Sequence, residues 1–223
     1  MIYLFCNDKY GRHFIKVAQI YSIKENTPLT LVLSEKSSAL QESRGKLMVK
    51  LLQFLRKIYF IIKFSCVCKI PYLIVKEVNS SSFYEKIKPN DFGIIAGFNQ
   101  IFKKEPIRRF SHLVNFHPSV LPYYRGPVPS YWCIKNGESY TGYTLHKVTE
   151  NIDKGEIFYQ EIVPIDRIDR PDILDTKIAK KASLKLIEYL DHIQKGTTME
   201  TVKLDADKIY KTHTDYCPFP EKT

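Results

Sequence analysis

The sequence predicts an α/β protein with a doubly wound (Rossmann-like), mostly parallel sheet and a short C-terminal appendage. In the first half of the chain, short β-rich runs alternate with segments whose apolar residues recur at helical spacing. This order places strands in parallel with helices on both faces. The runs are also apolar at consecutive positions, as doubly covered strands should be. The chain has 223 residues and is 44% hydrophobic, enough for one domain with a full core.

The first half of the chain is expected to hold five strands. They cover residues 1–6, 30–33, 71–75, 93–98 and 112–116. Between the first two, apolar residues at helical spacing predict a helix; they are Phe14, Val17, Ala18 and Tyr21. Together these elements complete the βαβ alternation.

Residues 47–66 are strongly apolar, but they carry Lys50, Arg56, Lys57 and Lys63. These charges are too many for a bilayer core, so we expect no stable membrane insertion. On a helix the charges gather on one face. We therefore expect a basic helix over 46–63 that packs on the sheet or contributes to a homodimer interface. The strands after residue 141 are the other candidate for that interface. A helix resting on an anionic membrane surface is the alternative.

The pattern changes after Pro118, where four prolines break up a loop. Residues 141–148 and 155–165 alternate apolar and polar side chains and predict one antiparallel pair. A helix then opens near Pro171 and ends at Gly196. We expect two units. They are an α/β domain over 1–195 and a polar tail over 196–223, which forms a small hairpin or contacts substrate or a dimer partner.

The net charge of +10 favours anionic partners, such as nucleic acid, membrane phosphates or a phosphorylated substrate, without choosing among them. The five cysteines include no CxxC pair, so neither a disulfide framework nor a structural zinc site is expected. The first residues, MIYLFCN, read as a strand and not as a signal peptide. A cytoplasmic protein fits these features best.

Asn115 and His117 are the first candidate functional residues. They end an apolar strand two residues apart, so their side chains point to one face. Pro118 then takes the chain out of the sheet. Ligands of open α/β sheets bind beyond the carboxyl ends of the strands. A polar pair that only caps the strand end is the alternative interpretation.

The wider context of this pair is more specific. The segment NFHPSVLPYYRG (115–126) is followed by TGYTLHKVTENIDKGEI (141–157). An Asn-x-His, a Ser-Val-Leu-Pro loop and an Asp two residues before Gly155 occur in this order. Over about residues 91–160 the chain resembles the folate-dependent formyltransferases. These include glycinamide ribonucleotide formyltransferase, methionyl-tRNA formyltransferase and the sugar N-formyltransferases.

The resemblance implies that Asn115, His117 and Asp153 are catalytic, that 10-formyl-tetrahydrofolate is the co-substrate and that no metal is needed. The chemistry of these residues agrees. An amine that attacks a formyl carbon creates an oxyanion, to which Asn115 and His117 can donate hydrogen bonds. His117 can also move protons, and an ionised Asp153 would favour the imidazolium. His146 alternates inward on its strand and is interpreted as structural.

The resemblance also implies where the folate binds. In this family the pterin is held largely by backbone groups of two loops. The corresponding residues here are Gln100, Ile101 and Phe102 in the first loop, and Thr149, Glu150, Asn151, Ile152 and Asp153 in the second.

The acceptor is predicted from three features. The stretch YRGPVPSYWCIKNGESYTGYTLH resembles the sugar-nucleotide branch, CNDKYGRHF lacks a Gly-rich phosphate loop, and only a short tail stands where a tRNA-binding domain would be. We therefore expect a nucleotide-linked amino sugar, best a dTDP-linked 4-amino-4,6-dideoxy sugar for surface polysaccharide such as the O-antigen of lipopolysaccharide. Nucleic acid is not expected as a partner. Lys76 and Arg125 are candidate substrate contacts, with solvated surface as the alternative.

Other activities stay open at this point. Glycinamide ribonucleotide and methionyl-tRNA are the alternative acceptors. A folate-dependent hydrolase would release formate to water, but such proteins usually carry a small regulatory domain first. A non-catalytic folate or nucleic-acid binding module would keep the fold alone, and the intact set of Asn115, His117 and Asp153 argues against it.

Overall fold

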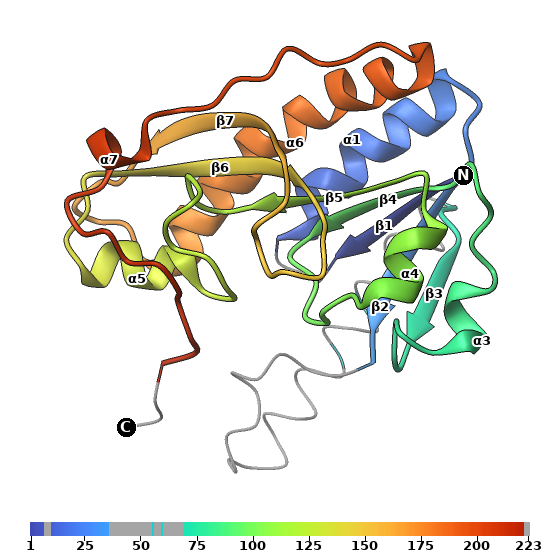
Figure 1. Cartoon of the computed structure of the whole chain (residues 1–223), viewed down its shortest axis with the longest axis horizontal. Helices are drawn as coiled ribbons and strands as arrows, with labels where there is room; N and C mark the ends of the chain where they lie inside the picture. The colour runs from blue at the N-terminus through green and yellow to red at the C-terminus, as the bar shows by residue number, and fades with distance from the viewer. Residues whose placement is uncertain (7–9, 36–54, 56–58, 60–68, 221–223) are drawn as a thin grey trace.

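The computed structural model describes residues 1–6, 10–35, 55, 59 and 69–220. In this part of the chain, seven strands form one sheet in the order β3-β2-β1-β4-β5-β6-β7, shown in Figure 1. The elements are β1 (Ile2–Cys6), α1 (Gly11–Lys24), β2 (Leu29–Ser34), β3 (Tyr72–Val75), α3 (Ser81–Tyr84), β4 (Phe92–Ala96), α4 (Lys104–Arg109), β5 (His112–His117), α5 (Pro129–Lys135), β6 (Tyr140–Lys147), β7 (Ile157–Pro164), α6 (Pro171–Lys195) and α7 (Ala206–Ile209). The predicted α/β fold is confirmed.

The five strands β1 to β5 are parallel, whereas β6 and β7 are antiparallel, as their alternating pattern predicted. The chain leaves β1 towards β2 and β3, and then returns to β4 on the other side of β1. The order of strands therefore reverses between β1 and β4. At such a point the loops after neighbouring strands diverge and leave a crevice at the carboxyl edge of the sheet.

Alternation along β1 shows how the two faces of the sheet are covered. Ile2, Leu4 and Cys6 belong to a core cluster that includes buried residues of α1 and α6. Tyr3 and Phe5 belong to a second cluster, on the face that α3 and α4 cover, as Figure 1 shows. One apolar stripe of α6 is buried at every position; its residues are Leu174, Ile178, Ala182, Leu186 and Leu190. Burial on both faces therefore explains why the central strands read as continuous apolar runs.

Two elements differ from the sequence expectation. The proline-rich segment after Pro118 contains a helix, α5, because Pro129 stands at its first turn, where a missing N–H costs nothing. At the edge of the sheet, β3 is not covered on both faces, since the side chains of Tyr72 and Ile74 are 40% and 48% exposed. Of the basic helix predicted over 46–63, the structure describes residues 55 and 59 alone, so the helix itself lies outside what can be compared.

The C-terminal segment runs back over the molecule. It forms α7 and two isolated bridges, Tyr159 to Val202 and Arg125 to Tyr216. Gly196 ends α6 in the left-handed conformation, as predicted. The division at residue 195 stays a prediction, because residues 206, 210 and 217 of the tail share a core cluster with the loop after β5.

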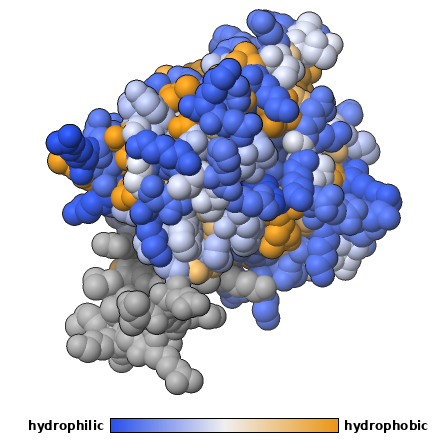
Figure 2. All heavy atoms as spheres, turned by 60° about the vertical axis from the view of Figure 1, so that its left-hand side comes forward, coloured by the Kyte–Doolittle hydropathy of each residue, from blue (hydrophilic) through white to orange (hydrophobic). Residues whose placement is uncertain are grey.

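The surface mixes apolar and hydrophilic residues. On the face shown in Figure 2, apolar residues lie in small groups among hydrophilic ones. In the described ranges, no helix is long and apolar enough to cross a bilayer. The homodimer stays a prediction.

Candidate active site

The candidate site lies at the carboxyl end of β5. There β5 pairs with the antiparallel β6, and Asn115 lies opposite His146 in the register. The loop between β6 and β7 returns to the same place and carries Asp153. Asp153 is 38 positions from Asn115 in the sequence. The loop thereby brings it together with the two residues at the end of the strand.

Asp153 is the centre of this cluster. Its Oδ2 accepts a hydrogen bond from the Gly126 N–H at 2.8 Å and lies 3.6 Å from Nδ1 of His117. Its Oδ1 accepts a long hydrogen bond from Nδ2 of Asn115, at 3.4 Å, and lies 3.6 Å from Nε2 of His146. The three residues predicted from the sequence thus share one site, together with a fourth that was interpreted as structural.

Local backbone geometry explains how Asp153 reaches this position. Its φ is +52°, in the left-handed region that Asp tolerates better than most residues. Two residues later, a Cβ on Gly155 would lie 1.7 Å from the carbonyl oxygen of Lys147. Only glycine fits this close approach. The Asp-Lys-Gly sequence is therefore what allows the loop to turn sharply beside β6.

His117 is almost fully buried, with 4% of its side chain exposed. Its Nε2 donates to the carbonyl oxygen of Tyr124 at 2.9 Å, and this nitrogen carries the proton because a carbonyl can only accept. Burial lowers the pKa of His117, opposed by Asp153 and the Tyr124 carbonyl. The ring is therefore neutral at pH 7, and its free nitrogen, Nδ1, faces Asp153.

Burial would raise the pKa of Asp153, but its neighbours outweigh that effect. At the acid pH at which a carboxyl would take up a proton, His117 is itself protonated, and its charge, together with His146 and the Gly126 N–H, holds this pKa well below its usual range. Asp153 is consequently ionised at neutral pH. The site thus pairs a fixed negative charge with a neutral imidazole.

His146 was interpreted as structural from the sequence, yet it contacts two members of the site. Its Nδ1 donates to the carbonyl oxygen of Lys147 at 2.9 Å, which leaves Nε2 to face Asn115. Asn115 Nδ2 donates to that nitrogen at 3.2 Å. This contact fixes which end of the Asn115 amide faces Asp153. The register of β6 against β5 would have revealed it, but the sequence alone does not supply that register.

The first predicted folate loop follows β4. The side chain of Gln100 is used within the protein, because its amide bridges Ser34 on β2 and the backbone of Val75, Lys76 and Val78 beside β3. Ile101 is 62% exposed and Phe102 is buried in the core. This loop is therefore anchored at its two ends and exposed between them.

The second predicted folate loop is residues 149–153. The Thr149 hydroxyl donates to the carbonyl of Asn151, and the carbonyl of Ile152 accepts from Arg125 at 3.3 Å. Glu150 is exposed. In the described part of the chain, no three His, Cys, Asp or Glu side chains are grouped as metal ligands.

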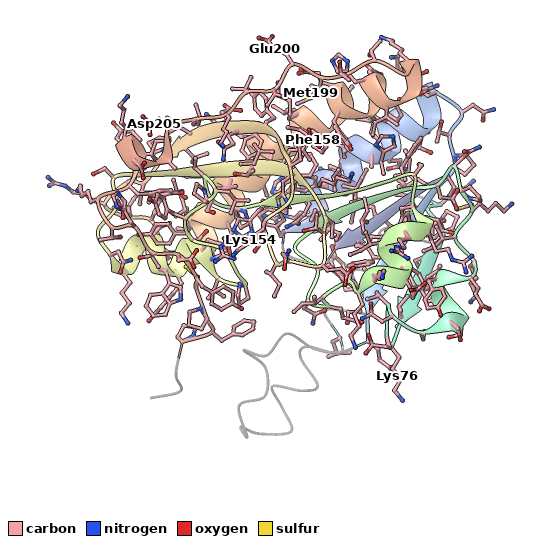
Figure 3. The ribbon with its side chains drawn as sticks, viewed as in Figure 1. Lys76, Lys154, Phe158, Met199, Glu200 and Asp205 are labelled. Carbon is pink, nitrogen blue, oxygen red and sulfur yellow. The ribbon has the colours of Figure 1, made fainter. Side chains whose placement is uncertain are left out.

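The two predicted substrate contacts lie in different places. Arg125 is adjacent to Gly126, and its guanidinium binds the carboxylate of Asp215. Lys76 follows β3 at the edge of the sheet, four strands from β5. At about 4.8 Å per strand, this separation is roughly 19 Å. Figure 3 shows the amine of Lys76 pointing away from the ribbon, far from Lys154 of the β6–β7 loop. The structure therefore does not bring Lys76 to the cluster around Asp153.

Comparison with known proteins adds to this geometry. Residues 75–190, slightly more than half of the chain, match the family model described as formyl transferase. The chain belongs to the formyl transferase family. The matched region holds β4 to β7 and every residue of the cluster around Asp153.

Among curated relatives, the chain is 31% identical over 132 residues to a methionyl-tRNA formyltransferase of Thermodesulfovibrio yellowstonii, covering 58% of this chain and 43% of that protein. The chain thus spans less than half the length of this formyltransferase.

Solved structures share the fold at lower identity. A glycinamide ribonucleotide transformylase from Symbiobacterium toebii has a TM-score of 0.64 and 17% identity, over 87% of each chain. An N-formyltransferase from Helicobacter canadensis, solved with folinic acid and dTDP-3-aminofucose, has a TM-score of 0.62 and 21% identity, over 97% of this chain and 69% of that one.

Proposed function

We propose that this chain transfers a formyl group from 10-formyl-tetrahydrofolate to the amine of a nucleotide-linked 4-amino-4,6-dideoxy sugar, best a dTDP-linked one for surface polysaccharide. The observation that carries the proposal is the convergence of Asn115, His117 and Asp153 at the carboxyl edge of the sheet, in a chain of the formyl transferase family. The predicted cytoplasmic location and homodimer belong to this proposal.

The chemistry follows from the charges of the site. The acceptor amine attacks the formyl carbon, and the carbonyl oxygen becomes an oxyanion. Asn115 is partly exposed, unlike the buried His117, and its 3.4 Å contact with Asp153 is long enough to be exchanged for the oxyanion. Neutral His117 accepts the proton that the amine loses. Ionised Asp153, 3.6 Å away, stabilises the imidazolium that results.

Collapse of the intermediate completes the transfer. The bond between the formyl carbon and the folate nitrogen breaks, and that nitrogen takes a proton as it leaves. His117 returns the proton that it accepted, so the site ends in its starting state. The products are the formylated amine and tetrahydrofolate, and every atom is accounted for without a further reactant.

The folate would bind along the two loops that flank the cluster, residues 100–102 and 149–153. The first loop follows the carboxyl end of β4, next to the point where the strand order reverses, and the second loop carries Asp153 to within 3.6 Å of His117. Exposed backbone in these loops can recognise the pterin without specific side chains. Asp153 belongs to one loop and to the catalytic cluster, so binding of the folate and positioning of its formyl carbon would be coupled.

The choice of acceptor rests on the sequence. The run from Tyr124 to His146 resembles the sugar-nucleotide branch, and the net charge of +10 suits a diphosphate. The Helicobacter canadensis enzyme, solved with dTDP-3-aminofucose, shows that a protein of this fold binds a dTDP-linked amino sugar. Lys76 and Arg125 stay proposed contacts, and Arg125 would serve as one while it stays paired with Asp215.

Methionyl-tRNA is the second candidate acceptor. A specific observation favours it, namely the 31% identity to the methionyl-tRNA formyltransferase of Thermodesulfovibrio yellowstonii. The positive charge of the chain also suits RNA.

A competition among acceptors tests the assignment. The protein is incubated with 10-formyl-tetrahydrofolate and, separately, a dTDP-amino sugar, methionyl-tRNA or glycinamide ribonucleotide, and kcat/KM is measured for each. We expect the highest kcat/KM with the amino sugar. A higher value with methionyl-tRNA or glycinamide ribonucleotide would make the acceptor assignment wrong and leave the formyl transfer standing.

A further inference from the structure

One short segment contacts both titrating residues of the site. The carbonyl oxygen of Tyr124 accepts a hydrogen bond from Nε2 of His117 at 2.9 Å. The N–H of Gly126 donates a hydrogen bond to Asp153 at 2.8 Å. They are the shortest hydrogen bonds made by the side chains of His117 and Asp153 in the described part of the chain. The position of residues 124–126 therefore sets the geometry of the pair.

The C-terminal tail holds this segment in place through backbone hydrogen bonds. The Tyr124 N–H donates to the carbonyl of Thr214 at 2.7 Å, and the Arg125 N–H donates to that of Asp215 at 3.0 Å. In the other direction, the Cys217 N–H donates to the carbonyl of Arg125 at 2.7 Å. Residues 124–126 thus lie between the tail on one side and the two catalytic residues on the other.

A side-chain pair reinforces this contact. The Arg125 guanidinium donates to both oxygens of Asp215, at 2.6 Å to Oδ2 and at 2.9 Å from Nε to Oδ1. Its other terminal nitrogen donates to the carbonyl of Ile152 at 3.3 Å. Only 12% of the Arg125 side chain is exposed, compared with 72% for Asp215. Asp215 therefore fixes a guanidinium that also contacts the residue directly before Asp153.

The tail is anchored independently of this pair. Glu138, which is 5% exposed, accepts hydrogen bonds from the Tyr124 hydroxyl and from the backbone N–H groups of Lys211 and Thr212. Burial of Tyr210 and Cys217 adds an apolar anchor. Loss of the Asp215 carboxylate would thus leave the tail attached, and only the fine position of residues 124–126 would change.

We propose that Asp215 is a positioning residue of the active site, which acts through Arg125 to hold the backbone of residues 124–126 against His117 and Asp153. This inference rests on the proposed function, because it assigns the tail a part in the same site. Bidentate pairing with an arginine fixes orientation as well as distance, so a carboxylate is the group suited to this task.

The test replaces Asp215→Asn, which keeps the shape of the side chain and removes its charge. Asp205→Asn is the matched control, because Asp205 is another partly exposed tail acid, paired with Lys208 and not with the site. We expect kcat to fall roughly tenfold in Asp215→Asn, with Tm unchanged, and Asp205→Asn to keep the full kcat. Asp215→Glu should recover most of the activity.

A second readout does not depend on turnover. In the wild-type protein, Asp153, His146, Arg125 and the Tyr124 carbonyl surround His117. Removing the Asp215 charge leaves Arg125 uncompensated and loosens the Tyr124 contact, and both effects should lower the NMR titration midpoint of His117. This shift should appear even if the protein formylates none of the acceptors tested, so a failure of the proposed function is distinguishable.

Three outcomes would overturn the proposal. They are an unchanged kcat and His117 titration in Asp215→Asn, an equal loss in Asp205→Asn, and a lower KM for an anionic acceptor in Asp215→Asn. The last result would mean that Asp215 occupies a guanidinium that the substrate needs.

Discussion

Replacing Asp153→Asn is the sharpest perturbation of the proposed mechanism. Asparagine has the same shape and tolerates the left-handed backbone of this position, where φ is +52°. It can still accept the Gly126 N–H, but it removes the negative charge that faces His117. Most other substitutions would add backbone strain and confuse the two effects.

The size of the effect can be worked out from the geometry. Two unit charges 3.6 Å apart interact by about 4–5 kcal/mol at an effective dielectric constant of about 20. That interaction exists only when His117 holds the proton of the amine, so it lowers the barrier and not the ground state. Each 1.4 kcal/mol corresponds to about tenfold in rate, and kcat should therefore fall by about 10³-fold.

The assay follows formyl transfer at saturating folate and acceptor, so that kcat and not binding is compared. Asp205→Asn serves again as the charge-matched control, and Tm reports whether the variant is folded. A folded Asp153→Asn protein with a kcat within tenfold of wild type would refute the assigned part of Asp153.

Further predictions concern neighbouring residues. His117→Asn should lower kcat at least 100-fold at saturating substrate, because it removes the proton acceptor; a near-normal kcat would contradict this. For the wild-type protein, log kcat/KM should be flat around pH 7 and fall only below the usual histidine pKa of 6.5. The reason is that the neutral form of His117 is required and burial lowers the pKa of this residue. A fall in log kcat/KM with its midpoint above pH 6.5 would count against this. Gly126→Ala should destabilise the protein by about 1–3 kcal/mol and lower kcat, because its φ is +103° and its Cβ would lie 2.8 Å from the ring of Tyr216. The control Gly137→Ala, also at positive φ but with open space around it, should leave kcat unchanged in the same urea-unfolding and activity series.

The fold was predictable because its signals are periodic. Continuous apolar runs mark strands that are buried on both faces, and the stripe of α6 has helical spacing. Asn115 and His117 could be found for the same reason, since a spacing of two on a strand fixes a common face. The resemblance supplied Asp153, whose position depends on a left-handed turn that periodicity does not encode.

The parts that were missed depend on contacts between distant segments. His146 joins the site because β6 pairs with β5 in one register, and a shift by one residue would turn its side chain to the other face. Asp215 meets Arg125 across 90 positions of sequence through an irregular tail. Such polar contacts leave no repeating pattern, so only the structure brings them together.

The proline-rich loop illustrates a different limit. Prolines were interpreted as breaking the chain after Pro118, and they do separate β5 from the next element. Pro129, however, begins α5, because a helix start tolerates both the fixed φ and the missing N–H of proline. The same residue type is therefore compatible with a loop and with a helix N-terminus, and its neighbours decide between them.

The central claim is tested most directly by the fate of a labelled formyl group. The wild-type protein is mixed with 10-formyl-tetrahydrofolate carrying an isotopic label in the formyl carbon, together with a dTDP-4-amino-4,6-dideoxy sugar or its 4-hydroxyl analogue. We expect the label to appear on the amine and not on the analogue, and Asp153→Asn and His117→Asn to slow its transfer. Label released as free formate would indicate a hydrolase, and label that stays on the folate with every acceptor would indicate a binding module; either result would contradict the account.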